Sequence, residues 1–139
     1  MRAVAMLTLL LATAPSFACD GLDVTNAWIR EAPPGAEMLA GYAELHNASR
    51  QSITLDGARS PDFGDVEMHR TSMENGKMRM RAEPQIVLEP DATVTFEPGG
   101  VHLMLMEPKR ALKTGDHVAI KLDCGKHSKA IDFTVRADQ

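Results

Sequence analysis

The feature that most constrains the fold is a succession of short segments in which apolar and polar residues alternate, separated by turn residues roughly every 8–12 positions. In residues 117–124, every second side chain is apolar from Val118 to Cys124, so these side chains would share one face of a strand. No stretch keeps a helical period long enough to indicate an α-helix. The pattern predicts a single all-β domain, either a sandwich or a barrel.

Clusters of proline, glycine and asparagine interrupt the apolar segments and set their limits. The expected strands cover residues 22–29, 38–45, 53–55, 66–70, 77–81, 86–88, 94–96, 101–106, 117–124 and 131–135. Aromatic residues are few, with one Trp, one Tyr and four Phe, so the core between these strands must be mostly aliphatic.

Residues 1–18 have the pattern of a secretory signal peptide. Arg2 supplies a positive start, residues 3–14 form an apolar run, and Ser16 and Ala18 occupy the −3 and −1 positions of a signal-peptidase site. The apolar run is too short to span a bilayer. The alternative to a signal peptide is an ordinary buried N-terminal helix. We therefore expect cleavage after Ala18, a periplasmic domain of residues 19–139, and no membrane insertion of the mature chain.

Two cysteines, Cys19 and Cys124, remain after this cleavage. In an oxidising compartment an even number of cysteines indicates a disulfide. The bridge would close a loop of about a hundred residues, worth roughly 4–5 kcal/mol in the chain-entropy model. The alternative is that Cys19 is a lipidated first residue. The preceding residues fit a lipobox poorly, because leucine is missing and Phe17 is bulky.

Charge and motifs exclude several classes of function. The formal net charge is −4 without a basic cluster, so nucleic acid and anionic membrane surfaces are not expected partners. The sequence contains no nucleophile elbow, phosphate-binding glycine loop or H-E-x-x-H motif, and we expect no enzyme. Asp62, Asp65 and Glu67 lie close together, but at the start of a strand they are expected to form a solvated edge.

Methionine is concentrated in one part of the chain. Six methionines and two histidines fall within residues 68–106: Met68, His69, Met73, Met78, Met80, His102, Met104 and Met106. Methionine commonly fills cores. That role does not suit Met73, Met78 and Met80, because they flank a polar hairpin tip. Some of these side chains are therefore candidates for binding a metal.

Strand geometry would let one hairpin and one strand present two imidazoles and two thioethers to a common point. A two-residue Asn75-Gly76 turn places His69 opposite Ala82 and Met80 diagonally across from His69. His102 and Met104 are two residues apart on another strand and share a face, with Leu103 and Leu105 on the core side. Met106 continues that face as a possible auxiliary ligand.

The chemistry of this set selects the metal. Thioethers are soft, neutral ligands that prefer Cu(I), and imidazole also binds it. Zinc sites favour Cys, His and carboxylate ligands. Four neutral ligands leave a single positive charge on Cu(I), which costs less to hold near a protein surface than a divalent ion. The sequence thus predicts one Cu(I) per chain, held by His69, Met80, His102 and Met104.

The spacing H-x10-M-x21-H-x-M of these residues resembles the signature of the periplasmic copper chaperone family PCuAC. Residues 27–35 look like that family's W-x-R-x-x-P segment, residues 66–71 like its V-E-x-H-x-T, and residues 98–106 like its P-G-G-x-H-x-M-L. The resemblance covers about residues 22–135. It implies a cupredoxin-like or immunoglobulin-like β-barrel or sandwich that delivers Cu(I) toward the CuA centre of cytochrome c oxidase, with subunit II or an assembly factor as acceptor. We expect the chain to be a monomer.

Other functions fit parts of the pattern. A blue-copper electron carrier shares this fold class but needs a cysteine thiolate, and the spacing of Cys124 and His127 is loosely suitable. Metal catalysis requires an open coordination position, which four ligands do not leave. The strongest alternative keeps the same site for copper buffering, copper tolerance or supply to another cuproenzyme.

Overall fold

The computed structural model describes residues 19–137 and confirms an all-β fold. The predicted signal peptide, residues 1–18, lies outside the described residues. The strands are β1 (Leu22–Arg30), β2 (Met38–Asn47), β3 (Ile53–Leu55), β4 (Gly57–Arg59), β5 (Phe63–Glu74), β6 (Lys77–Ala82), β7 (Ile86–Leu88), β8 (Thr93–Phe96), β9 (Val101–Pro108), β10 (His117–Cys124) and β11 (His127–Arg136). No helix in residues 19–137 is both long and apolar enough to cross a membrane.

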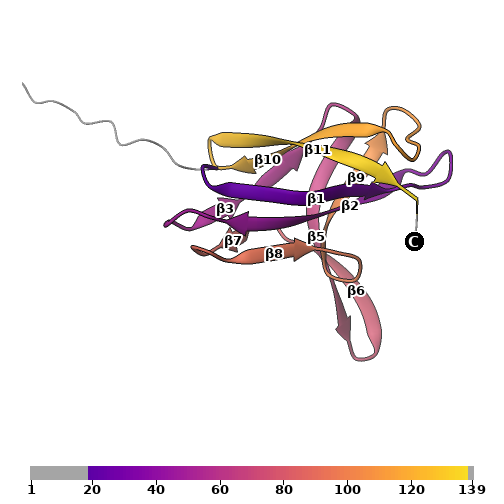
Figure 1. Cartoon of the computed structure of the whole chain (residues 1–139). Helices are drawn as coiled ribbons and strands as arrows, with labels where there is room; N and C mark the ends of the chain where they lie inside the picture. Colours follow the sequence, from indigo (N-terminus) through magenta and orange to yellow (C-terminus); the bar gives the residue numbers. More distant parts are fainter. Residues whose placement is uncertain (1–18, 138–139) are drawn as a thin grey trace, which may run out of the picture.

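Nine strands form one curved sheet, in the order β4-β10-β11-β1-β2-β8-β9-β5-β6 (Figure 1). β4 pairs with β10 and also with β5, through Ala58 and Val66, so the sheet closes on itself like a barrel. β1 runs parallel to β11, which ties the two ends of the chain together. β3 and β7 form a small separate sheet.

The core follows from strand parity. Along β9, Val101, Leu103 and Leu105 are buried in an aliphatic core that also holds three of the phenylalanines. On β10, alternate residues from Val118 to Cys124 are buried, as the sequence predicts. Side chains at the intervening positions of β9, including His102 and Met104, therefore point to the outer surface of the sheet.

The β5–β6 hairpin is the exception to core packing. Every residue of β6 is exposed, and the hairpin projects away from the rest of the domain (Figure 1). Asn75 and Gly76 have φ values of +52° and +73°, the left-handed conformation that a tight hairpin turn of this kind requires. The predicted register is confirmed, because His69 pairs with Ala82 and Thr71 pairs with Met80.

Several strands are longer than predicted. The largest extensions are in β5, which runs from Phe63 to Glu74, and in β11, which begins at His127, and both reach a hairpin turn through mostly polar residues. β4 was not expected at all. Backbone pairing with a neighbouring strand forms these segments, and they bury too few apolar side chains to leave an alternating pattern in the sequence.

The predicted disulfide joins Cys19 to Cys124, with 5.6 Å between their Cα atoms. Cys124 is buried on the core face of β10. The bridge fastens the segment before β1 to the end of β10. It also occupies the Cys19 sulfur, so the same atom cannot carry a lipid thioether.

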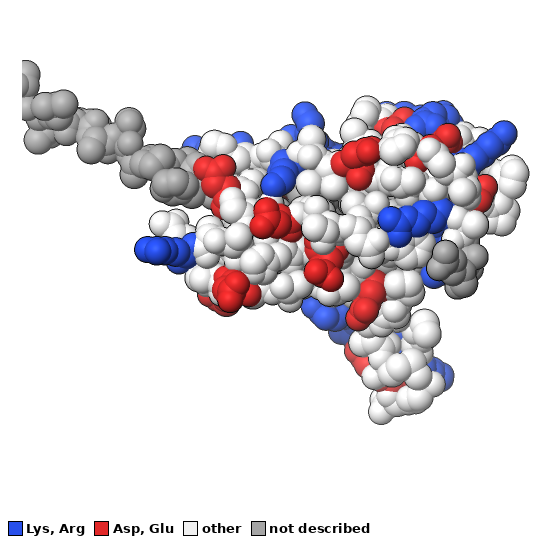
Figure 2. Space-filling model, in the orientation of Figure 1, with Lys and Arg blue, Asp and Glu red and all other residues white. Residues whose placement is uncertain are grey.

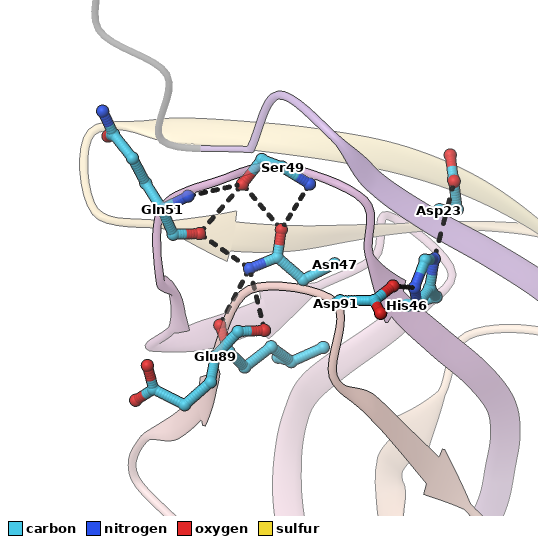
Figure 3. A network of polar contacts seen from close by, with 8 residues as sticks. Asp23, His46, Asn47, Ser49, Gln51, Glu89 and Asp91 are labelled. Carbon is cyan, nitrogen blue, oxygen red and sulfur yellow. Dashed lines mark hydrogen bonds and ion pairs between the residues drawn. The ribbon is translucent and has the colours of Figure 1, made fainter.

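A buried asparagine organises the loops at the end of β2 (Figure 3). The Asn47 side chain is fully buried, and its amide nitrogen donates to the backbone carbonyls of Gln51, Leu88 and Glu89 at 2.7, 2.9 and 3.2 Å. Its oxygen accepts hydrogen bonds from the backbone nitrogen and hydroxyl of Ser49. One side chain thus ties the β2–β3 loop to the end of β7.

We predict that replacing both cysteines with serine lowers the free energy of unfolding by roughly 4–5 kcal/mol, because the bridge closes a loop of about a hundred residues in the unfolded chain. Urea unfolding of the mature protein measures the effect. Wild type unfolded in the presence of a reductant is the control and should match the Cys19→Ser/Cys124→Ser variant. Equal stability of the oxidised wild type and the variant would contradict the prediction.

We also predict that Asn47→Ala lowers the free energy of unfolding by about 2–3 kcal/mol, because it leaves buried backbone groups without partners. Ser49→Ala is the matched control, since it removes one hydroxyl and keeps all three bonds of the Asn47 amide nitrogen. Its effect on the urea midpoint should be clearly smaller. Equal effects of the two substitutions would show that the amide network contributes little.

Candidate metal centre

The structure brings all four predicted ligands to one face of the sheet. His102 on β9 lies directly opposite His69 on β5, with ring centroids 6.2 Å apart. Met104 is two residues further along β9 and pairs with Glu67. Met80 on β6 pairs with Thr71 and so lies diagonally across from His69. We call His69, Met80, His102 and Met104 the four-residue site.

Exposure rises across this site from one side to the other. His102 is 5% exposed, the His69 side chain 14%, and Met80 50%, while Met104 is half-buried. Met80, His102 and Met104 line a hollow that is also bordered by Arg30, Ala32 and Met38. An ion held here would have buried imidazoles on one side and an accessible thioether on the other.

Hydrogen bonding leaves one ring nitrogen of His102 free for a ligand. Its Nδ1 lies 3.1 Å from the carbonyl oxygen of Gly100, which can only accept, so Nδ1 carries the proton. Gly99, with φ of +81°, and Gly100 make the turn that aims this carbonyl at the ring. In the neutral ring Nε2 is then unprotonated and available to a metal.

In His69 the hydrogen-bonded nitrogen is Nε2, the opposite of the arrangement in His102. Its Nε2 lies 2.7 Å from Oε2 of Glu67, so in the neutral ring Nε2 carries the proton that the carboxylate accepts and Nδ1 is unprotonated. This Nδ1 is buried and has no hydrogen-bond partner among the described residues. A buried nitrogen without a partner is costly. A metal bound to Nδ1 would supply the missing interaction, and the residues present therefore fit a metal ion.

Glu67 makes a contact that was not expected. A solvated edge was expected for Asp62, Asp65 and Glu67; the Glu67 side chain is 44% exposed, and its carboxylate also binds the His69 ring. The signal for this contact is the two-residue spacing, because residues 67 and 69 lie on the same face of one strand. Asp62 instead pairs with Arg110, which also contacts Asp116.

The other candidates lie around the site. Met106 follows Met104 on the same face of β9, pairs with Asp65 and Met38, and is half-buried. Its auxiliary role stays a prediction. Outside the site, His46 and His117 contact carboxylates. Across residues 19–137, no three side chains of the His, Cys, Asp and Glu types gather as a metal site.

An aromatic pair on β1 and β2 lies next to Arg30, which lines the hollow. The rings of Trp28 and Tyr42 lie 4.7 Å apart, and the Arg30 guanidinium lies over the Tyr42 ring at 5.5 Å from its centroid. Of the tryptophan and the arginine in residues 27–35, Arg30 thus lines the hollow, while Trp28 contacts the Tyr42 ring. Blue-copper chemistry is excluded, because both cysteines of the chain are in the disulfide and neither offers a thiolate.

Residues 22–136 match the family described as "Putative lipoprotein LpqE-like". A protein of Leifsonia xyli subsp. xyli described as "Putative lipoprotein Lxx21020" is 30% identical over 112 residues, which are 80% of this chain and 66% of that protein. Rickettsia prowazekii protein RP573 is 32% identical over 82 residues, 58% of this chain and 45% of that protein. The chain thus spans less than two thirds of either relative's length.

Solved structures share the fold. The copper-bound PCuAC domain from PmoF2 superimposes with a TM-score of 0.69 at 25% identity, covering 85% of this chain and 94% of that domain. The Cu(I) form of DR1885 from Deinococcus radiodurans gives a TM-score of 0.63 at 30% identity, covering 84% and 80%. These likenesses confirm the resemblance to PCuAC domains that the motifs indicate.

We predict that Glu67 fixes the ring of His69 for metal binding. Glu67→Ala should weaken Cu(I) binding by about 10–100-fold, the usual cost of removing a group that orients a metal-bound histidine. Glu67→Gln is the matched control and should lose less, because its amide oxygen still accepts from Nε2. Competition with a Cu(I) chelator measures both.

A second readout needs no metal. In the metal-free protein, nitrogen-15 spectra of the neutral rings should show the proton on Nε2 of His69 and on Nδ1 of His102. The same tautomer in both rings would contradict the assignment, as would equal Cu(I) affinities of Glu67→Ala and wild type.

Proposed function

Because the chain belongs to the LpqE-like family and shares the fold of PCuAC domains, we propose that it is an exported metallochaperone that carries one Cu(I) in the four-residue site. One observation carries the proposal. Two imidazoles, each with one nitrogen free of hydrogen bonds to the chain, lie on one face of the sheet with two thioethers.

The donor set accounts for the choice of Cu(I). Thioether sulfur is a soft donor that prefers monovalent copper over the harder divalent ions. All four ligands bind in their neutral forms, so the ion adds one positive charge to the site. The site also needs no thiolate, which suits an oxidising compartment in which the two cysteines are bridged.

The exposure of Met80 supports transfer rather than storage. Half of this side chain is exposed, and it stands on β6, a strand without any buried residue. An incoming ligand from an acceptor could displace the Met80 thioether while the two buried imidazoles still hold the ion. A storage site gains nothing from such an accessible ligand.

For the acceptor we propose the CuA centre of cytochrome c oxidase, reached through subunit II or an assembly factor, as the resemblance to PCuAC implies. Copper buffering, tolerance, or supply to another cuproenzyme is the alternative, because the ligand set would be the same. Nearby arginines do not distinguish these partners, since Arg79 and Arg81 pair with Glu74 and Arg70 pairs with Glu83. Periplasmic location is part of the proposal and is supported by the disulfide and by the signal-peptide pattern of residues 1–18.

Anaerobic titration with Cu(I) against a chelator tests the binding. We expect one Cu(I) per chain in wild type and loss of this binding in the variant His69→Ala/Met80→Leu/His102→Ala/Met104→Leu, because all four donors are gone. The control is His46→Ala/His117→Ala, two histidines outside the site, which should bind as wild type does. Undiminished affinity in the four-residue variant would refute the assignment.

Delivery is tested separately. The Cu(I)-loaded protein is mixed with a copper-free soluble CuA domain, and copper is measured on each protein after separation. We expect copper to move to the CuA domain, and a strain lacking the gene to lose oxidase activity at low copper and regain it with added copper. If the deletion strain is instead sensitive to copper with normal oxidase activity, the protein serves tolerance.

A further inference from the structure

Two methionines outside the four-residue site have no structural role in the fold. Met73 on β5 and Met78 on β6 are 66% and 72% exposed, although methionine is an apolar side chain. They pair directly across the hairpin, so their side chains lie next to each other. We call Met73 and Met78 the outer methionine pair.

The pair faces the same way as the four-residue site. The side chains at positions 69, 71 and 73 of β5 all point to one side of the hairpin. Positions 78, 80 and 82 of β6 pair with these three, so their side chains point to the same side. The opposite side carries charge, where Glu74 binds both Arg79 and Arg81. The sulfur-bearing side is thus continuous from the hairpin tip to His69 and Met80.

The position of the hairpin rules out core packing as the reason for these methionines. The hairpin projects from the domain, and β6 pairs only with β5 in the sheet (Figure 1). In the space-filling view the projecting hairpin is mostly white, with small areas of blue and red (Figure 2). Met73, Met78 and Met80 on this hairpin are 66%, 72% and 50% exposed, so their side chains face solvent rather than the core.

Three thioethers lie within reach of one another on this side. Residues directly opposite in a hairpin have Cβ atoms about 4.5–5.5 Å apart, which applies to Met73 and Met78. Residues two apart on a strand are separated by roughly 6.5–7 Å, which applies to Met78 and Met80. Flexible methionine side chains can close these gaps around one soft ion.

We propose that the outer methionine pair is a second, weaker binding site for Cu(I), called the outer station. It exchanges the ion with the four-residue site through Met80, which is a ligand in both. The inference rests on the proposed function. The step is a ligand exchange: the thioethers of Met73 and Met78 leave the ion as His69, His102 and Met104 bind it. Copper stays monovalent, and no proton is released, because every ligand is neutral. The ion moves inward because the four-residue site adds two imidazoles to the thioethers.

Methyl NMR on the mature, disulfide-bonded protein with carbon-13 methionine methyl groups tests the station directly. Ag(I) is the probe, since it is a soft monovalent ion that does not change oxidation state here. We expect the first equivalent to shift the methyl signals of Met80 and Met104, and further Ag(I) to shift those of Met73 and Met78. Unmoved Met73 and Met78 signals at excess Ag(I) would overturn the proposal.

The relay is tested by kinetics with Cu(I) supplied as a bicinchoninate complex. Met73→Leu/Met78→Leu keeps the apolar volume and removes both sulfurs. We expect slower uptake by this variant at an unchanged final affinity for the first Cu(I). The control is Ser72→Ala/Arg79→Gln, the neighbouring cross-strand pair on the opposite side of the hairpin, with wild-type uptake expected. Equal uptake rates in the leucine variant and wild type would overturn the relay.

The two failures are distinguishable. If Met80 and Met104 respond to the first equivalent but Met73 and Met78 never respond, only the outer station fails. If Met80 and Met104 do not respond at all, the proposed function fails, and the relay fails with it.

Discussion

The candidate site depends on the position of one strand, β5. It pairs with β9 on one side, which sets His69 opposite His102, and with β6 on the other, which sets Met80 diagonally across. Its register is fixed from the core side, where Val66 and Met68 are 5% and 4% exposed. A slip of one residue would turn His69 into the core and Met68 out of it, and no metal ligand would then face its partners.

Hydrogen bonds fix the tautomers of His69 and His102 in complementary ways. A backbone carbonyl holds the proton on Nδ1 of His102, and a carboxylate holds it on Nε2 of His69. Each ring therefore offers one unprotonated nitrogen before any ion arrives, and that of His69 is buried without a partner. Because both rings can bind without losing a proton, capture and release of a monovalent ion involve mainly ligand exchange. In the proposed function, the half-exposed Met80 would be the ligand best placed to leave first.

Local chemistry explains which features were predictable from the sequence. The Asn75-Gly76 turn determines pairing only a few residues away, so the relation of His69 to Met80 followed from it. Parity along β9 likewise placed His102 and Met104 opposite the core. The pairing of β5 with β9 joins residues more than thirty positions apart, and only the family motif indicated it. Nothing local predicted β4, because it depends on pairing with strands that tertiary structure brings next to it. The contact of Glu67 with His69 is local, since the two-residue spacing places both side chains on one face of β5, but the expectation of a solvated edge did not use that signal.

The central claim is that His69, Met80, His102 and Met104 together hold one Cu(I). X-ray absorption spectroscopy of the Cu(I)-loaded protein tests it most directly, because it counts the nitrogen and sulfur neighbours of the copper. We expect two nitrogen and two sulfur neighbours in wild type, and the loss of one sulfur neighbour in Met80→Leu while the nitrogen neighbours remain. A copper shell without sulfur, or one unchanged by Met80→Leu, would contradict it.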